Sequence, residues 1–331
     1  MKLSILELVT ISSGSSLSES IDHTVEVAQH VEKLGYERVW FAEHHNMQHI
    51  ASSAPQILIG HIAGKTGKIR VGAGGIMLPN HTPLLVSEQF GTLEALYPGR
   101  IDLGLGRAPG TDQNTAVAIR KNNLHRAGSF EADVRELQAY FETGDIMNGV
   151  HAFPGEGQNV PLWILGSSTD SAYLAAKLGL PYCFASHFAP AQLESAILIY
   201  RHNFVPSTYL DSPYVMAGIN LFAAETNEEA EFFATSMYKM FLAGLINSKG
   251  PLESPGAMPD IYSSPQIRHT IEQMLLHTYC GTKETIAKEV SIFSAKFKVD
   301  ELMINSPFFD HQARMKSFSI IREALHDQNQ E

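Results

Sequence analysis

The stretch IRVGAGGIMLPNHTPLLVSEQFGTLEALYPGRIDLGLGRAPG, from Ile69 to Gly110, decides the fold. Its first part, residues 69–79, starts as an apolar, β-branched alternation and then runs through three glycines. This pattern predicts a buried strand whose end comes close to something flat. A helix is expected next, because Thr82 is a suitable N-cap, Pro83 suits the first helical position, and Tyr97-Pro98-Gly99 ends it.

A second strand, RIDLGLGRAPG at residues 100–110, follows this helix and again ends in glycines. A cation, Arg107, comes directly after its apolar part. Two successive strand-and-helix units that both place glycine and polar groups at the carboxyl end of the strand are typical of the catalytic face of a parallel α/β fold.

The same alternation continues outward along the whole chain. Eight apolar segments are each followed by a helical pattern, and this uninterrupted order predicts a single (β/α)₈ barrel domain over residues 1–331. A doubly wound sheet of eight strands is the alternative. The expected strands are Leu3 to Ile11, Arg38 to Ala42, Ile69 to Pro79, Arg100 to Gly110, Pro161 to Leu165, Tyr182 to Ala185, Val215 to Ala223 and Glu301 to Asn305.

One segment departs from the regular pattern. Between about residues 243 and 278, after the seventh strand, four prolines are scattered among glycine and serine. A proline-rich segment of this length inside a compact fold is more often a lid or a binding insertion than a plain connection. We therefore expect an insertion between the seventh and eighth strands.

Composition excludes several classes of function. The 331 residues are 44% apolar, which is enough for a large core. The net charge of −11 leaves no basic face, so neither nucleic acid nor an anionic membrane is an expected partner. We interpret residues 1–14 as a strand rather than an export signal, because Glu7 interrupts the apolar run, and no run is long enough for a bilayer. Two cysteines, Cys183 and Cys280, exclude a disulfide framework and indicate the reducing cytoplasm.

Residues at the carboxyl ends of the strands share one opening in a barrel. Glycines beside an apolar wall leave a flat slot, because a planar ligand can approach their backbone closely. Arg107 next to a hydroxyl-rich turn that starts a helix makes an anion site. A planar slot beside a phosphate site indicates a phosphorylated flavin or nucleotide. The strand-end residues are Ser12, Ser13, Glu43, His44, His45, Gly74, Gly75, Met77, Gly106, Arg107, Gly166, Ser167, Ser168, Ser171, Ser186 and His187.

Each of these features also has a purely structural interpretation. Gly74-Gly75 suits a β-bulge or close packing of strand and helix. The serines after the fifth strand suit a helix cap, and Arg107 has Asp102 and Asp112 as surface partners. The glycines of the strand at residues 100–110 do not match the dinucleotide fingerprint, because their spacing is one residue too long and a proline intervenes.

Histidines gather after the second strand. Glu43, His44, His45 and His49 are candidates for a metal cluster, but the HExxH order is missing, and adjacent residues of one strand end face opposite ways. No metal site is predicted. We favour His44 as a catalytic acid/base, because imidazole titrates near neutrality and this residue lies at the mouth. His187, after the sixth strand, is a second candidate.

Five motifs give the chain a specific resemblance to a known family. They are AEHHNM at 42–47, ASSAP at 51–55, GGIMLPNH at 74–81, LYPGRIDLGLGRAPGTD at 96–112 and PLWILGSS at 161–168. Together they resemble the bacterial-luciferase-like, flavin-dependent monooxygenases, and within them an uncharacterised bacterial branch. The resemblance covers essentially the whole chain.

The resemblance implies a (β/α)₈ barrel, a homodimer, and an insertion that closes over a flavin, which suits residues 243–278. The family's active-site histidine falls on His44, and its non-proline cis peptide beneath the isoalloxazine ring falls on Gly74-Gly75. Its phosphate-binding arginine falls on Arg107, and its phosphate-binding hydroxyls fall on Ser168 and Ser171, after the fifth strand. The cofactor-binding set expected from motifs and resemblance together is Gly74, Gly75, Met77, Arg107, Gly166, Ser167, Ser168, Ser171 and His187.

The implied chemistry needs two proteins. A separate NAD(P)H:flavin reductase supplies reduced FMN, and dioxygen and the reduced flavin then oxygenate a small organic substrate, while His44 supplies a proton and water is excluded. The luciferase catalytic subunit carries a reactive cysteine where this chain has Gly106, so light emission and the long-chain aldehyde pocket are not implied. Two other functions stay open: a deazaflavin-dependent oxidoreductase of the same superfamily, and a flavin-binding protein without catalysis.

Overall fold

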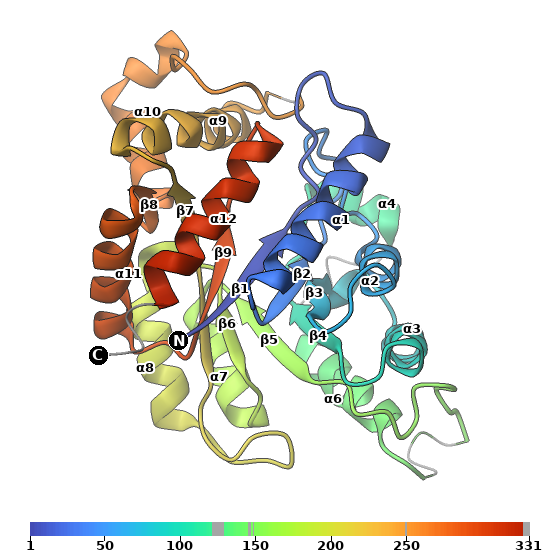
Figure 1. Ribbon diagram of the computed structural model, residues 1–331. Helices are drawn as coiled ribbons and strands as arrows, with labels where there is room; N and C mark the ends of the chain where they lie inside the picture. The colour runs from blue at the N-terminus through green and yellow to red at the C-terminus, as the bar shows by residue number, and fades with distance from the viewer. Residues whose placement is uncertain (121–128, 145–146, 148, 249, 327–331) are drawn as a thin grey trace.

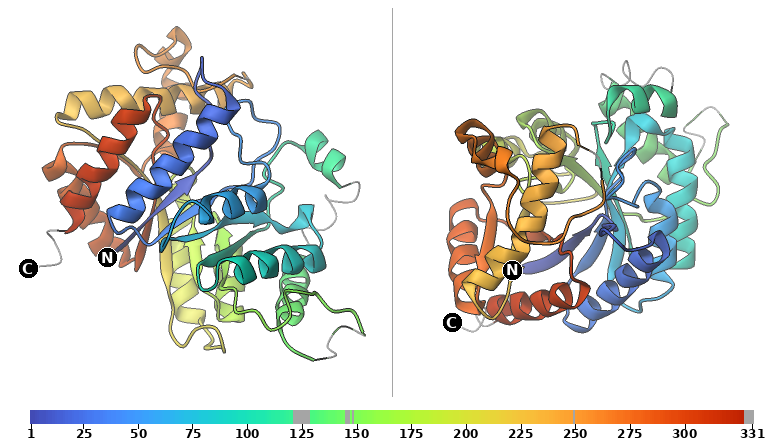
Figure 2. Two further views of the ribbon diagram at one scale, coloured as in Figure 1. Left: turned by 45° about the vertical axis from the view of Figure 1, so that its right-hand side comes forward. Right: turned by 90° about the horizontal axis from the view of Figure 1, so that it is seen from above.

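Eight parallel strands form a closed barrel in the computed structural model, which describes residues 1–120, 129–144, 147, 149–248 and 250–326. Each strand pairs with the next one along the barrel, and the last pairs with the first. Figures 1 and 2 show helices packed around this barrel. The predicted (β/α)₈ barrel is confirmed, and the doubly wound alternative is wrong. The barrel strands are β1 (Lys2–Glu7), β2 (Arg38–Phe41), β3 (Arg70–Met77), β4 (Ile101–Gly106), β5 (Leu162–Gly166), β6 (Tyr182–Phe184), β7 (Val215–Ala223) and β9 (Glu301–Asn305).

Helices follow the barrel strands, and side-chain caps fix several of their first turns. The side chains of Thr282 and Asp310 accept hydrogen bonds from the backbone N–H groups of Thr285 and Ala313. Thr82 occupies its predicted N-cap position, but its side chain makes no capping hydrogen bond. The helices around the barrel are α1 (Leu17–Lys33), α2 (Pro55–Ala63), α3 (Pro83–Leu96), α6 (Phe130–Phe141), α7 (Thr169–Leu178), α8 (Leu193–Asn203), α11 (Lys283–Phe297) and α12 (His311–His326), with a short α4 (Gln113–Ile119) that was not predicted.

The segment between β7 and β9 contains more regular structure than its proline-rich sequence indicates. It holds α9 (Asn227–Leu245), the 3₁₀ helix η4 (Asp260–Ser263), α10 (Pro265–Met274) and β8 (Thr278–Gly281). Neither α10 nor β8 was predicted. Proline is the first residue of α10, where its missing N–H costs nothing. The strand β8 forms because β7 extends beyond its barrel partners, so that its last four residues can pair with β8.

This segment also reaches back to the loop after β1. Backbone hydrogen bonds of 2.8 Å join Ser13 N to Leu252 O and Leu252 N to Ile11 O. Leu252 is buried there, and Figure 1 shows the orange segment beside the blue loop. The insertion therefore contacts the carboxyl end of the barrel. Within the described ranges, none of the helices has the length and apolar character that a membrane span requires.

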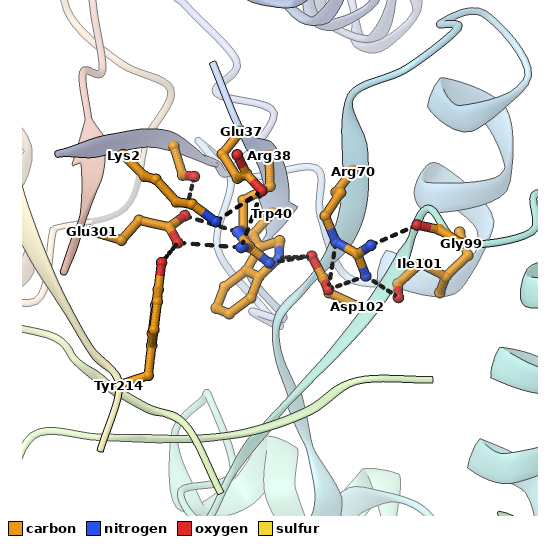
Figure 3. Close-up of polar contacts among 11 residues, drawn as sticks. Lys2, Glu37, Arg38, Trp40, Arg70, Gly99, Ile101, Asp102, Tyr214 and Glu301 are labelled. Carbon is orange, nitrogen blue, oxygen red and sulfur yellow. Dashed lines mark hydrogen bonds and ion pairs between the residues drawn. The ribbon is translucent and has the colours of Figure 1, made fainter. Parts of the chain in front are cut away.

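Charged residues fill the amino end of the barrel interior. Arg38 donates hydrogen bonds to Glu301 Oε1 and to Asp102 Oδ2, both at 2.8 Å. Trp40 also donates to Asp102, and Figure 3 shows how these side chains point toward one another. A cluster of mainly apolar side chains packs inside the barrel beyond this network, and it consists of Leu6, Trp40, Ala42, Trp163, Cys183, Met216 and Met303.

Candidate functional site

A cavity of about 200 Å³ opens at the carboxyl ends of the barrel strands. Its wall combines residues at the ends of β2 to β6 with side chains from the barrel interior. The structure brings all ten predicted site residues to this one cavity, while the role of each stays a prediction. They are His44, Gly74, Gly75, Met77, Arg107, Gly166, Ser167, Ser168, Ser171 and His187.

Other strand-end residues do not line the cavity and have structural contacts instead. The Ser12 hydroxyl donates to the carbonyl oxygen of Phe309 at 3.3 Å, and the Ser186 hydroxyl donates to that of Gly218 at 2.6 Å. The remaining residues of this kind are Ser13, Glu43 and His45.

Interior side chains that the sequence analysis did not assign to the site form the floor of the cavity. Most are apolar, so a ligand that enters is removed from water. Alternate residues of a barrel strand face the interior. This two-residue period along each strand is the sequence signal that could have identified the interior side chains. The floor consists of Leu6, Trp40, Ala42, Leu165, Cys183 and Met303.

Gly74 and Gly75 form a flat ledge in the cavity wall. Their peptide bond is cis, as the resemblance implied. A Cβ on Gly74 would lie 2.9 Å from the Cβ of Trp40, and a Cβ on Gly75 would lie 2.6 Å from the carbonyl oxygen of Gly104. The pairing register between β3 and β4 shifts between Ala73 and Ile76, which flank the two glycines. The predicted β-bulge and the cis peptide therefore occur in the same stretch of backbone. Packing keeps the ledge free of side chains, which lets a planar ligand approach.

Glu43 anchors the end of β3 that carries this ledge. Its buried carboxylate accepts hydrogen bonds of 2.9 to 3.0 Å from the Met77 backbone, the Asn80 amide, and the rings of His45 and His81. Burial alone would raise the pKa of this carboxyl, but the hydrogen bonds from His45 and His81 outweigh it and lower the pKa to about 2. No group of three or more His, Cys, Asp or Glu side chains within the described part of the chain is arranged to hold a metal ion.

His44 is placed after β2 by its backbone. Its N–H donates to the carbonyl oxygen of Ser52 at 3.2 Å, and its Nδ1 lies 3.3 Å from the carbonyl oxygen of Gly110. A carbonyl only accepts, so Nδ1 carries the proton and Nε2 is the basic nitrogen of the neutral ring. Burial lowers the pKa of His44 and outweighs the Gly110 carbonyl and the Glu43 charge, which raise it. His44 therefore accepts a proton before it can supply one.

His187, after β6, faces the same cavity from another side. Its Nδ1 lies 2.3 Å from the position that a Cβ on Gly218 would take, so only glycine fits there on β7. This Nδ1 is buried and has no hydrogen-bond partner within the residues that the structure covers. Burial, and after it the neighbouring His44, lowers the pKa of His187 to about 3. The ring is therefore a neutral polar group with hydrogen-bonding capacity to spare.

Arg107 follows β4 and reaches the first turn of α7. Its Nη1 and Nη2 lie 3.4 and 3.3 Å from Asp170 Oδ2. The surface partners considered from the sequence, Asp102 and Asp112, are therefore wrong. Asp102 pairs with Arg38 near the other end of the barrel, and Asp112 caps α4. Asp170 was not among the residues predicted from the sequence, although its place among the serines after the fifth strand was a signal.

The start of α7 supplies the other half of this polar corner. Ser168 occupies the N-cap position, but its hydroxyl makes no capping hydrogen bond, so the cap interpretation fails for it. The Ser171 hydroxyl donates to the Ser168 carbonyl at 2.6 Å. A Cβ on Gly166 would lie 2.0 Å from the Ser171 Oγ, which explains the glycine. A helix start beside a guanidinium favours an anionic group.

These features fit a planar cofactor that carries a phosphate. The ledge and the apolar floor suit a fused ring system, and Arg107 with the start of α7 suits the phosphate. His44 adds a proton acceptor to the same cavity. The molecule is thus an α/β barrel of the class whose ligands bind at the carboxyl ends of the strands.

The sequence as a whole then identifies the family. The family model described as luciferase-like monooxygenase matches residues 1–291. The chain is 48% identical to the uncharacterized protein YvbT of Bacillus subtilis (strain 168), with 97% of this chain and 96% of that protein covered. It is 46% identical to the luciferase-like monooxygenase of Escherichia coli (strain K12), with 96% and 95% covered. It is 32% identical to the N-acetyl-S-alkylcysteine monooxygenase of Bacillus subtilis (strain 168), with 98% of each covered. The chain belongs to the luciferase-like monooxygenase family.

Solved structures share the fold. That of apo-MsnO8 has a TM-score of 0.88 at 32% identity and covers 98% of each chain. The oxygenating constituent of 3,6-diketocamphane monooxygenase from Pseudomonas putida, in complex with FMN, has a TM-score of 0.75 at 14% identity, with 99% and 98% covered. An F420-dependent secondary alcohol dehydrogenase has a TM-score of 0.69 at 16% identity, with 98% and 99% covered. The last two likenesses show the fold alone.

Proposed function

We propose that this protein is a flavin-dependent monooxygenase that takes reduced FMN from a separate NAD(P)H:flavin reductase and uses dioxygen to oxygenate a small organic substrate. The observation that carries the proposal is the single cavity that joins the Gly74-Gly75 ledge, two neutral imidazoles and the Arg107 corner. Support also comes from relatives that are named as monooxygenases and from a structural neighbour that was solved with FMN.

The chain's own residues would bind and orient the cofactor. Gly74 and Gly75 would lie against the ring, with Met77 beside them. Arg107 would hold the phosphate by a charge-assisted contact, together with the backbone and hydroxyls at the start of α7. When bound, reduced FMN supplies the electrons that activate dioxygen. The residues after β5 that would share the phosphate are Gly166, Ser167, Ser168 and Ser171.

His44 would manage the proton. In the neutral ring, Nδ1 is committed to the Gly110 carbonyl, which orients Nε2 as the acceptor for a proton released in the cavity. The same nitrogen can then return that proton to the oxygenated product. Burial lowers the pKa of His44 and favours the neutral ring at the start of the reaction, which supports a residue that acts first as a base and then as an acid.

The floor would receive the organic substrate. Trp40, Leu165 and Met303 offer apolar contacts, and this apolar floor would exclude water from the reaction. The His187 ring is the polar group that would orient an uncharged substrate or the cofactor ring. A homodimer, a cytoplasmic location and a single barrel domain over residues 1–331 complete the proposal.

Arg107→Ala tests the phosphate assignment. We expect at least a tenfold loss in affinity for reduced FMN, about 1.4 kcal/mol or more, because a charge-assisted contact is lost. Anaerobic titration of the purified variant measures it. The control is Arg135→Ala, because Arg135 is also exposed and paired with a carboxylate, Glu131, but does not line the cavity. Unchanged affinity in Arg107→Ala excludes the phosphate assignment.

The alternative enzyme is a deazaflavin-dependent oxidoreductase, which the likeness in fold to an F420-dependent dehydrogenase keeps open. Mixing the protein under air with reduced FMN or with the reduced deazaflavin coenzyme, while oxygen uptake is recorded, separates the two. Free reduced FMN consumes oxygen unaided in air, so each record is compared with one taken without protein. A monooxygenase alters oxygen uptake only with reduced FMN. A flavin-binding protein without catalysis predicts that His44→Ala leaves both flavin affinity and cellular phenotype unchanged.

A further inference from the structure

Arg107 already has a partner, and that partner lies where an anionic ligand is expected. Both Nη atoms contact Asp170 Oδ2, at 3.3 and 3.4 Å, and the two side chains are 48% and 68% exposed. A charge-assisted hydrogen bond normally measures about 2.7 to 2.9 Å. The ion pair is therefore loose, and solvent reaches both of its members.

Asp170 owes its place to the geometry of α7. It is the second residue of this helix, and a carboxylate in the first turn is stabilised by the helix dipole. A phosphate at the same helix start would be attracted by the same N–H groups and by the same guanidinium. The Asp170 carboxylate and a ligand phosphate thus compete for one region of positive potential.

Neighbouring groups do not relieve this competition. The Thr169 N–H donates to Gln192 Oε1 at 3.0 Å, and the Ser171 hydroxyl donates to the Ser168 carbonyl. Both donors are therefore engaged before a ligand arrives. Arg107 is the only arginine or lysine among the described residues that line the cavity, and Asp170 offsets its charge.

We propose that Asp170 sets the affinity of the site for phosphorylated flavin. Its carboxylate neutralises Arg107 in the free protein and repels the incoming phosphate, so that the flavin binds weakly and leaves readily. This inference rests on the proposed function and extends it from which cofactor binds to how tightly it is held. Weak binding suits a flavin that arrives reduced from another protein and departs oxidised. One exposed charge at this distance is expected to change affinity about three- to tenfold.

The experiment measures dissociation constants for FMN and for riboflavin, which lacks the phosphate, by isothermal titration calorimetry at low ionic strength. Asp170→Asn should bind FMN about three- to tenfold more tightly than the natural chain and should bind riboflavin equally well. Asp170→Glu, which keeps the charge, should stay within about twofold for both ligands. In the double variant Arg107→Ala/Asp170→Asn, the gain for FMN relative to Arg107→Ala should be smaller, because the cation that Asp170 offsets is gone and only the direct repulsion of the phosphate is relieved.

Glu194→Gln is the matched control. Glu194 is the second residue of α8, is exposed, and pairs with Lys296 at 3.2 Å, so it repeats the helix position and the ion pair of Asp170 away from Arg107. Its FMN affinity should stay near that of the natural chain. Asp170→Asn should also lower the thermal midpoint slightly, because a favourable charge at a helix start is lost, so tighter binding cannot be ascribed to a more stable fold.

The outcomes separate this inference from the proposed function. If FMN binding depends on Arg107 but is unchanged or weakened in Asp170→Asn, the role of Asp170 is overturned and the phosphate site stands. If Asp170→Asn tightens riboflavin as much as FMN, the charge explanation is overturned as well. If the natural chain does not prefer FMN to riboflavin and Arg107→Ala changes nothing, both the phosphate site and the role of Asp170 are overturned.

Discussion

Two arginines stand near the two ends of the barrel interior, and they are held in opposite ways. Arg38, near the amino end, has a side chain that is only 6% exposed, and it is bonded to Asp102 and Glu301, whose side chains are fully buried. Arg107, at the carboxyl end, is 48% exposed and contacts Asp170 loosely. The two arginines therefore differ in what occupies their N–H donors. Protein carboxylates occupy those of Arg38, whereas a ligand can use those of Arg107.

The difference teaches where binding capacity resides in this fold. Desolvation alone would lower the pKa of Arg38, but Asp102 and Glu301 outweigh it and raise the pKa, so this cation stays charged and serves the barrel. Arg107 has not been desolvated, so a ligand can take up its charge without breaking the core. Under the proposed function, stability and flavin binding depend on separate arginines, and this separation can be tested.

The largest expected effect breaks the buried network. Arg38→Ala leaves two buried carboxylates without their shared cation, and we expect a loss of about 3 to 5 kcal/mol in the free energy of unfolding. Arg107→Ala, the matched substitution at the other end, should cost less than about 1 kcal/mol, because exposed ion pairs contribute little. Urea unfolding of both variants measures the difference. Equal losses would contradict the contrast between the two ends.

A smaller effect concerns Glu43, the buried carboxylate at the carboxyl end. Its folded pKa of about 2 lies below the unfolded value of about 4.3, so its stabilisation is fully present above pH 5 and is lost as the pH falls toward 2. This pH-dependent stabilisation amounts to about 3 kcal/mol, and more than half of it is lost once the pH has fallen to 3. The stability difference between the natural chain and Glu43→Gln should therefore shrink on acidification. A pH-independent difference for Glu43→Gln would refute the linkage.

The sequence predicts the placement of the site residues better than their contacts. His44 and Arg107 each follow a buried strand, and Gly74 lies in the carboxyl-terminal half of another. In a parallel barrel the carboxyl ends of all strands meet at one opening, so their convergence follows from topology. The ion pair of Arg107 with Asp170 does not follow from topology, because it depends on how two side chains turn at the surface. Local patterns favoured nearby partners, and the actual partner is 63 residues away.

The same limit applies to the fold. The eight barrel strands were predictable, because each has a run of apolar residues between turn signals. The strand β8 was not predictable from its sequence. TYCG has only four residues, and it forms a strand because β7 extends past the barrel and pairs with it. The role of Glu43 was also hidden, because three of its donors lie 34 to 38 positions away and come close only once β3 has paired with β2.

The smallest expected effect concerns the ledge at the carboxyl end. A Cβ on Gly75 would meet the backbone carbonyl of Gly104 at 2.6 Å, and backbone cannot move aside as a flexible side chain can. Gly75→Ala should therefore cost about 1 to 3 kcal/mol in stability, leave the barrel folded, and weaken FMN binding because the ledge is no longer flat. Gly244→Ala is the control, because its Cβ meets nothing within 4 Å in a helix where alanine is preferred, so stability should rise by about 0.5 to 1 kcal/mol. If Gly75→Ala is as stable as the natural chain and binds FMN equally well, packing does not enforce the ledge, and the open end of the barrel owes its shape to something other than glycine.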